Sequence, residues 1–352
     1  MRDPRPVAQV IEEDGVAAAI WKKHVVSLLF TYRCTLACRH CCFNCSPRKP
    51  PVLAPREDAL EYLRQLHAVD RVVHIAGGEA MMVYPELLDL CRAAGGLGIA
   101  PHFIETNATF ATSDGVTYER LTALREAGVQ GLLVSADPYH QEWCPPERQH
   151  RCVRIAREVF GARNVAAGDR SLAELRRMRT VGCDPALRAE HVRREPPCCV
   201  GRAGHELAAL LPDRPIEQLR DGMWHGGEGD PSCRLEFDPE TIWEVHIDPY
   251  GNFQTCCGIV LGNAQKTPLP DLLARGFLGI SPVIDAVYQG GPQALLSLAV
   301  ERGYRPREGY PQRCALCWEV RQFLRPFFPD VLAPDEVYLR DPAPDSGLPL
   351  SA

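Results

Sequence analysis

The sequence predicts an α/β fold built on a parallel β-sheet. Short apolar runs rich in β-branched residues alternate with stretches of helical apolar spacing, and this unit occurs at least four times in succession. Strands that alternate with helices run parallel, because each helix returns the chain to the same end of the sheet. The polar motifs of the first half follow strands directly, which places them at the carboxyl edge, where such folds bind ligands.

The predicted elements follow one another from the first apolar run onward. A buried strand is expected over 25–31, and a cysteine-containing loop leaves its carboxyl end. The later elements of this half are helix 57–67, strand 72–76, helix 85–94, strand 99–106, helix 117–127, strand 129–136, helix 147–160, a weak strand at 164–167 and helix 172–179. Residues 221–230 are Gly-rich and predict a linker, and the tail from Pro329 is expected to be a loose extension.

The bulk composition excludes several classes of protein. The chain has 352 residues and a net charge of −6, so no basic field favours nucleic acid or an acidic membrane. No apolar run approaches the ~20 residues that span a bilayer, and the N-terminus lacks the apolar core of a signal peptide. The 16 cysteines therefore favour metal binding in a reducing compartment over disulfides, and we expect a cytoplasmic protein.

Three cysteines in the loop after the first strand form the central motif, Cys34-x3-Cys38-x2-Cys41. Their thiolates can hold three irons of a [4Fe–4S] cluster and leave one iron open, because such clusters normally take four cysteine ligands. Structural zinc is the alternative, and Cys42 and Cys45 would add ligands for it. Zinc sites usually pair one Cys-x2-Cys with another, which this spacing does not match, so the motif favours iron–sulfur.

This motif resembles the signature of the radical S-adenosylmethionine (SAM) enzymes. The resemblance implies a partial (β/α)6 TIM-like barrel, which we assign to residues 24–220, after an N-terminal extension over 1–23. It also implies that the open iron chelates the amino and carboxylate groups of SAM. The reduced cluster of such enzymes cleaves SAM to a 5′-deoxyadenosyl radical, which abstracts a hydrogen atom from a substrate carbon.

Further motifs at strand ends resemble SAM-binding segments of this superfamily. Gly77-Gly78-Glu79 resembles the Gly-Gly-Glu-Pro motif that binds the SAM amino group, with Ala80 in place of proline, although alone it is an ordinary turn. Polar residues that end the third and fourth strands suit a ribose and a carboxylate, and His40 stands where relatives usually carry an aromatic residue near adenine. The predicted cofactor-binding residues are therefore His40, Gly77, Gly78, Glu79, Thr106, Asn107, Ser135 and Asp137.

A second set of cysteines lies in the C-terminal half, at Cys233, Cys256, Cys314 and Cys317. Four thiols can enclose either zinc or a [4Fe–4S] cluster, and the residues alone do not separate the two. Gly251-x4-Cys256 followed by Cys314-x2-Cys317 resembles the twitch domain, the short form of the SPASM extension. The resemblance implies one auxiliary [4Fe–4S] cluster in a small domain over 221–328, followed by a tail over 329–352. Cys233 is the least secure ligand, and Cys257 is its alternative.

These resemblances imply an oxidoreductase or maturase that takes electrons from a donor such as flavodoxin or ferredoxin. The substrate is either a small metabolite or a peptide, and the reaction is dehydrogenation, crosslinking or epimerisation. Only 33 residues precede Cys34, too few for a fused leader-peptide-binding domain, which favours the small metabolite. In the alternative, a maturase or epimerase of ribosomally made peptides, Cys198 or Cys199 donates the hydrogen atom. An alternative of another class is a zinc-stabilised binding module without catalysis.

Overall fold

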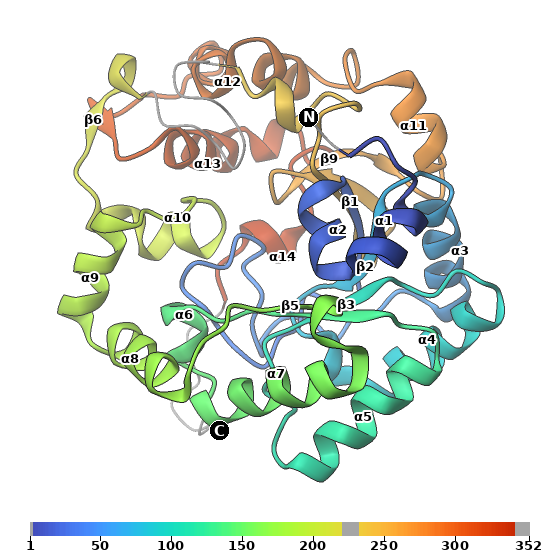
Figure 1. Cartoon of the computed structure of the whole chain (residues 1–352). Helices are drawn as coiled ribbons and strands as arrows, with labels where there is room; N and C mark the ends of the chain where they lie inside the picture. Colours follow the sequence, from blue (N-terminus) through green and yellow to red (C-terminus); the bar gives the residue numbers. More distant parts are fainter. Residues whose placement is uncertain (1–2, 220–231, 342–352) are drawn as a thin grey trace.

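The computed structural model describes residues 3–219 and 232–341, and a mixed β-sheet lies at its centre (Figure 1). The eight strands follow the order β5-β4-β3-β2-β1-β7-β8-β9. Strands β5 to β1 and β7 run parallel, while β8 and β9 are antiparallel. The strand bounds are β1 Val25–Leu29, β2 Val72–Ala76, β3 Phe103–Thr106, β4 Gly131–Val134, β5 Val165–Ala166, β7 Glu244–Ile247, β8 Asn252–Thr255 and β9 Ile259–Asn263.

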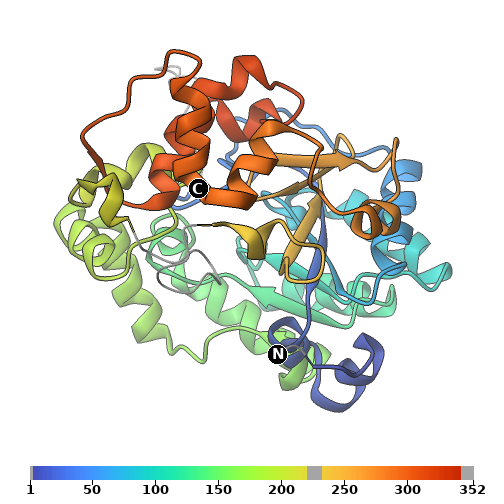
Figure 2. The same cartoon turned by 90° about the horizontal axis from the view of Figure 1, so that it is seen from above.

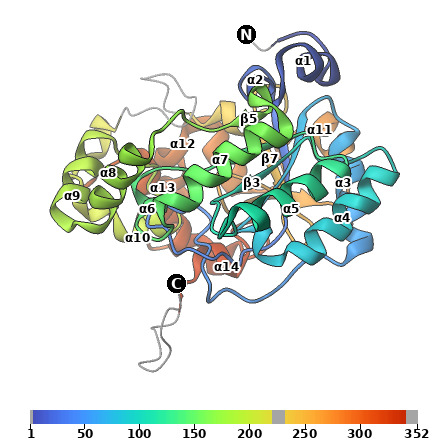
Figure 3. The ribbon, with the colours of Figure 1, turned by 60° about the horizontal axis from the view of Figure 1, so that its bottom comes forward.

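Helices of the first half connect successive parallel strands, as predicted. They are α3 Arg56–His67, α4 Tyr84–Gly96, α5 Asp114–Glu126 and α7 Pro146–Phe160, followed after β5 by α8 Leu172–Cys183. The first four lie side by side along one side of the molecule (Figure 3). The predicted α/β fold with a parallel sheet is therefore confirmed.

The remaining helices surround the sheet ends and the C-terminal segment. They are α1 Val7–Asp14, α2 Val16–Lys22, α6 Pro138–Gln141, α9 Pro185–Arg194, α10 Arg202–Glu206, α11 Leu269–Arg275, α12 Pro282–Val300, α13 Arg313–Leu324 and α14 Asp335–Tyr338. A separate pair of two-residue strands joins β6 (Arg214–Pro215) to β10 (Gly309–Tyr310). Seen from above, the C-terminal helices lie at the opposite end of the molecule from α1 and α2 (Figure 2). Among the described residues, we find no helix with the length and hydrophobicity of a membrane span.

The sixth parallel strand comes from the C-terminal segment. Strand β7 pairs with β1, with Val25 opposite Glu244 and Ser27 opposite His246. It continues into the antiparallel hairpin β7–β8, whose turn contains Gly251 at φ +79°. A Cβ on Gly251 would lie 2.8 Å from the Tyr62 hydroxyl oxygen, so the turn requires glycine. The hairpin carries Cys256 just beyond β8, as the sequence predicts.

The expectation of a loose tail from Pro329 is wrong for residues 329–341. Leu332 and Val337 are completely buried, and the Tyr338 hydroxyl donates a hydrogen bond of 2.7 Å to the Gly258 carbonyl oxygen. The proline and aspartate content suggested a loose tail, but Leu332, Val337 and Tyr338 of this stretch are buried in the core. Residues 342–352, and the linker predicted at 221–230, lie outside the described residues.

Candidate active site

One cavity of about 820 Å³ gathers the predicted cofactor residues at the carboxyl edge of the sheet. The loop between β1 and α3 contributes Cys34, Cys38 and Cys41 to its lining. The loops that follow β2, β3 and β4 contribute strand-end residues. Of the residues predicted to bind SAM, only Glu79 does not line this cavity. The others do, and they are His40, Gly77, Gly78, Thr106, Asn107, Ser135 and Asp137.

The glycine loop after β2 packs against the chain that leads into the cysteine loop. The Gly78 amide donates to the Thr31 carbonyl oxygen at 2.6 Å, and the Glu79 amide donates to that of Arg33 at 3.1 Å. A Cβ on Gly78 would lie 2.1 Å from the Arg33 carbonyl oxygen, closer than any side chain tolerates. Glycine is required here because two backbones meet at contact distance, and the contact fixes Cys34 relative to β2.

Glu79 is buried behind the cavity and supports its wall. Its carboxylate accepts hydrogen bonds from the Thr106 hydroxyl at 2.8 Å and from the Met81 and Asn107 amides at 3.0 and 2.7 Å. Burial raises the pKa of Glu79 to about 7 against these three hydrogen bonds. The Asn107 side-chain amide in turn donates to the Cys34 sulfur at 3.5 Å. Glu79 thus connects the end of β3 to the cysteine loop through Asn107.

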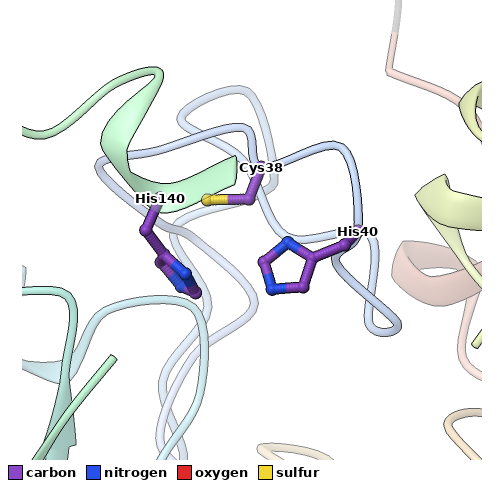
Figure 4. Close-up of side chains that lie close together, drawn as sticks. All are labelled: Cys38, His40 and His140. Carbon is purple, nitrogen blue, oxygen red and sulfur yellow. The ribbon is translucent and has the colours of Figure 1, made fainter. Parts of the chain in front are cut away.

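His40 and His140 lie beside Cys38 (Figure 4), and the Asp137 carboxylate contacts both histidines. One carboxylate oxygen accepts from the Tyr139 and His140 amides at the start of α6. The other lies 2.7 Å from His140 Nδ1 and 3.3 Å from His40 Nε2. Cys38 and the two imidazoles each offer a ligand atom within 4.8 Å of the others, close enough for one metal ion. Because Cys38 belongs to both sets, a single ion and a cluster would exclude one another here.

Arg202 clamps the cysteine loop from α10, a role that the sequence did not predict. The residue is buried, and its guanidinium donates to the Cys38 and Asn44 carbonyl oxygens at 3.0 and 3.1 Å. Its own amide donates to the Cys41 carbonyl oxygen at 2.9 Å. The preceding Gly201 has φ +57°, and a Cβ there would lie 2.2 Å from the Cys42 carbonyl oxygen. The only sequence signal was the Gly-Arg pair itself.

The electrostatic environment of the cysteine loop favours the ionised form of one thiol, that of Cys41. A hydrogen bond from the Cys45 thiol lowers the pKa of Cys41 to about 5, and the positive charge of Arg202 acts in the same direction. Burial raises the pKa of the Cys34 and Cys38 thiols, so these two need a bound cation to ionise. A thiol-lined cavity of this kind fits an iron–sulfur cluster, whose irons supply that positive charge.

A second, smaller cavity brings the C-terminal cysteines together. Its lining includes all four predicted residues, Cys233, Cys256, Cys314 and Cys317, and in addition Cys198. Arg321 is fully buried beside them and donates to the Cys256 carbonyl oxygen at 2.9 Å. Burial raises the pKa of Cys256 and Cys317, and the Arg321 charge opposes that effect. This donor set also fits an iron–sulfur cluster.

The two cavities share Cys198, Cys256 and Cys314 in their linings, and other cysteines line only one of them. Cys257 lines the large cavity, and its thiol is hydrogen-bonded to that of Cys42. It does not line the small cavity, so Cys233 accompanies the other three thiols there. Cys198 lines both cavities, whereas Cys199 is completely buried and its thiol contacts the Pro197 carbonyl oxygen.

Comparison with known proteins identifies the class. Residues 28–166 match the model of the Radical SAM superfamily, so the chain carries a radical SAM domain and is a radical SAM enzyme, as predicted. No curated protein matches the chain.

The chain matches several solved structures at low sequence identity, and BtrN and anSMEcpe are two of them. BtrN in complex with AdoMet and 2-DOIA has 15% sequence identity and a TM-score of 0.42, over 77% of this chain and 89% of that one. Native anSMEcpe with bound AdoMet and Cp18Cys peptide has 11% sequence identity and a TM-score of 0.38, over 87% of this chain and 96% of that one. The assignment to the superfamily rests on the sequence match and on the cysteine motif.

Proposed function

We propose that this enzyme carries two [4Fe–4S] clusters and uses SAM to abstract a hydrogen atom from an unactivated carbon. Cys34, Cys38 and Cys41 would hold the SAM-binding cluster. Cys233, Cys256, Cys314 and Cys317 would hold the auxiliary one. The observation that carries the proposal is the convergence of the first three cysteines with strand-end polar residues on one cavity. When bound, the first cluster supplies the electron that cleaves SAM reductively to a 5′-deoxyadenosyl radical.

The protein's own groups bind and orient the reactants in this proposal. Thr106, Asn107 and Ser135 would contact SAM from the strand ends, and Glu79 holds the first two in place. Asp137 and His40 would lie beside the adenosyl portion, since both line the cavity near Cys38. Arg202 keeps the cysteine loop in one conformation by saturating its carbonyl oxygens.

We further propose that the substrate is a small molecule and that the reaction is a net two-electron oxidation. The hydrogen atom would be carried away in 5′-deoxyadenosine and the substrate radical would lose a proton. A cluster held by the four C-terminal cysteines would supply the acceptor for the remaining electron. Flavodoxin or ferredoxin is the proposed donor of the initiating electron. The cavity of about 820 Å³ has the size of small-molecule and cofactor sites in enzymes.

A peptide epimerase is the second candidate function, and the position of Cys198 supports it. Cys198 lines the active-site cavity, so its thiol can reach a substrate radical, whereas Cys199 does not line it. A hydrogen donor predicts that product formed in D2O carries deuterium at the reacting carbon. Cys198→Ala would then still form 5′-deoxyadenosine but would lose this deuterium incorporation. Deuterium retained in the variant contradicts the donor role.

The test of the main proposal is 5′-deoxyadenosine formation by anaerobically reconstituted protein, with dithionite and SAM. The Cys34→Ala, Cys38→Ala and Cys41→Ala variants should each abolish it, whereas Cys183→Ser, at an exposed thiol, should not. Zinc without iron and no response to SAM would instead support the non-catalytic zinc module, for which Cys38, His40 and His140 offer a single-ion site.

A further inference from the structure

Charge is unevenly distributed along the chain, and the segment that contains α7, α8 and α9 is strongly basic. Residues 146–194 contain 12 arginines and six acidic residues. The segment therefore has a net charge of +6, in a chain whose net charge is −6. Its three helices follow one another along one edge of the molecule (Figure 1). We call residues 146–194 the basic edge.

The basic edge is hollowed between α7 and the loop that precedes α8. The hollow has a volume of about 390 Å³, and its lining includes Arg154, Arg157 and Arg170 but a single carboxylate, that of Asp169. Arg154 and Arg157 form ion pairs. In the described part of the chain, Arg170 has no ion pair and donates instead to the Ala136 carbonyl oxygen at 2.6 Å. The hollow therefore keeps an excess of positive charge.

Three further arginines of the basic edge keep their charge in the same way. Arg148, Arg179 and Arg188 donate to main-chain carbonyl oxygens at 2.9, 2.9 and 2.5 Å, and none of them forms an ion pair within the described ranges. A carbonyl oxygen orients a guanidinium but does not neutralise its charge. Because the rest of the chain is acidic, an anionic protein would be attracted to this edge and repelled elsewhere.

The basic edge lies close to Cys38 of the SAM-cluster motif. Arg179 on α8 donates to the carbonyl oxygen of Gln141 on α6. The preceding residue, His140, lies beside Cys38, and their ligand atoms are within 4.8 Å of each other (Figure 4). The short segment 136–141 therefore separates the arginines of the edge from a predicted cluster ligand.

This position favours an electron donor over a substrate as the partner of the basic edge. The described lining of the active-site cavity contains no arginine, so a molecule held by these arginines lies outside the space predicted to hold SAM. A radical must contact the carbon from which it abstracts a hydrogen atom. An electron, in contrast, can cross a thin layer of protein.

We propose that the basic edge docks an acidic electron-carrier protein, which delivers the electron that cleaves SAM. The inference rests on the proposed function, because it identifies where that electron enters the enzyme. One electron leaves the reduced carrier and reaches the site of Cys34, Cys38 and Cys41, and no bond or proton changes in this step. Charge complementarity supplies the association rate and the orientation of the carrier.

The reconstituted holoenzyme with SAM tests this proposal, with fully reduced flavodoxin, an acidic flavin protein, as the donor. The measurement is 5′-deoxyadenosine formation against flavodoxin concentration and, in parallel, with saturating dithionite, a small reductant that needs no docking surface. Raising the ionic strength from about 0.02 M to about 0.3 M should raise the flavodoxin concentration at half-maximal rate at least about tenfold, because salt screens exposed charges. The dithionite rate should stay within about twofold.

A double variant assigns the effect to the basic edge. Arg177→Glu/Arg193→Glu reverses two exposed charges, one on α8 and one on α9. At low salt it should raise the half-maximal flavodoxin concentration at least about tenfold, because reversed charges repel the carrier. Its dithionite rate should equal that of wild type, which checks that the variant is folded and loaded. Arg305→Glu, exposed and outside the basic edge, is the control and should change neither quantity.

Three results would overturn the proposal. They are the same flavodoxin dependence in the double variant as in wild type, no salt dependence of the flavodoxin reaction in wild type, and activity with dithionite but none with flavodoxin. The first of them would leave the basic edge to an acidic peptide substrate. Failure of wild-type protein to form 5′-deoxyadenosine with either reductant would instead reject the proposed function.

Discussion

The Arg202 guanidinium donates a hydrogen bond of 3.0 Å to the main-chain carbonyl oxygen of Cys38. The two residues are 164 positions apart in the chain, yet this contact sets the shape of the loop that carries the three thiols of the SAM-cluster motif. Arg202 also approaches Asp341 to 3.3 Å, with both side chains 7% exposed. A single buried cation therefore connects α10, the cysteine loop and the C-terminal stretch.

Arg202→Ala should destabilise the protein and empty the SAM-cluster site. Removing one member of a buried ion pair costs about 3–5 kcal/mol, because the partner remains buried without its counter-charge. We expect reconstituted Arg202→Ala to lack about four irons, those of one [4Fe–4S] cluster. The exposed Arg193→Ala is the matched control and should keep its iron. Full iron content in Arg202→Ala would show that the loop does not need this clamp.

Gly78→Ala should disrupt the contact between the glycine loop and the cysteine loop. The new methyl group would lie 2.1 Å from the Arg33 carbonyl oxygen, so one backbone must move and displace Cys34. We expect 5′-deoxyadenosine formation to fall at least about 100-fold, because small displacements of reacting groups have effects of that order. Gly115→Ala, in α5 with no atom within 4 Å of its Cβ, is the control and should leave activity intact. Equal activity of the two variants would contradict the packing argument.

His102 should make the fold sensitive to acid. Its Nδ1 accepts a hydrogen bond of 2.8 Å from the Val73 amide, and burial lowers its pKa to about 3. An unfolded histidine titrates near about 6.5, so below that pH the unfolded chain binds a proton that the folded chain refuses. The stability contributed by neutral His102 is therefore complete above about pH 6.5 and is lost as pH falls towards about 3.

Urea unfolding at about pH 7 and about pH 5 measures this effect. Asparagine keeps an acceptor in place of Nδ1 but does not titrate, so His102→Asn should lose about 2 kcal/mol less than wild type over that interval. The exposed His150→Asn should behave as wild type. Parallel pH profiles for wild type and His102→Asn would exclude His102 as the source.

Tyr338 should anchor the C-terminal stretch to the auxiliary site. It is 2% exposed and stacks on Trp318, with ring centroids 5.0 Å apart. Tyr338→Ala removes this contact and the hydrogen bond to Gly258, so we expect a loss of about 3–5 kcal/mol in the free energy of unfolding. Leu339→Ala, at a half-exposed neighbour, should cost far less. Similar thermal unfolding of both variants would mean that the stretch contributes little stability.

Local patterns predicted most of the first half correctly, because the strands and helices there follow their own periodicity. Strand 72–76 and helix 57–67 agree with β2 and α3 within one residue. The pairing of β7 with β1 was not predicted, because it depends on contacts over more than 200 residues and not on local propensity.

In the candidate site, too, some features could be predicted from the local sequence and others could not. The spacing of Cys34, Cys38 and Cys41 predicted which residues would gather, since ligands of one cluster are close in sequence. The clamp by Arg202 involves a single residue inside an ordinary helical stretch. Its significance comes from burial and from its contacts with the cysteine loop, which only the three-dimensional structure shows.

The iron, sulfide and zinc content of anaerobically reconstituted protein tests the central claim most directly. The two-cluster account predicts about eight irons per chain, with about four remaining when Cys34, Cys38 and Cys41 are all replaced by alanine. Replacing Cys233, Cys256, Cys314 and Cys317 should likewise leave about four. Cys183→Ser is the control and should retain the full iron content of about eight per chain. Zinc in place of iron, or an iron content that neither set of substitutions changes, would contradict the account.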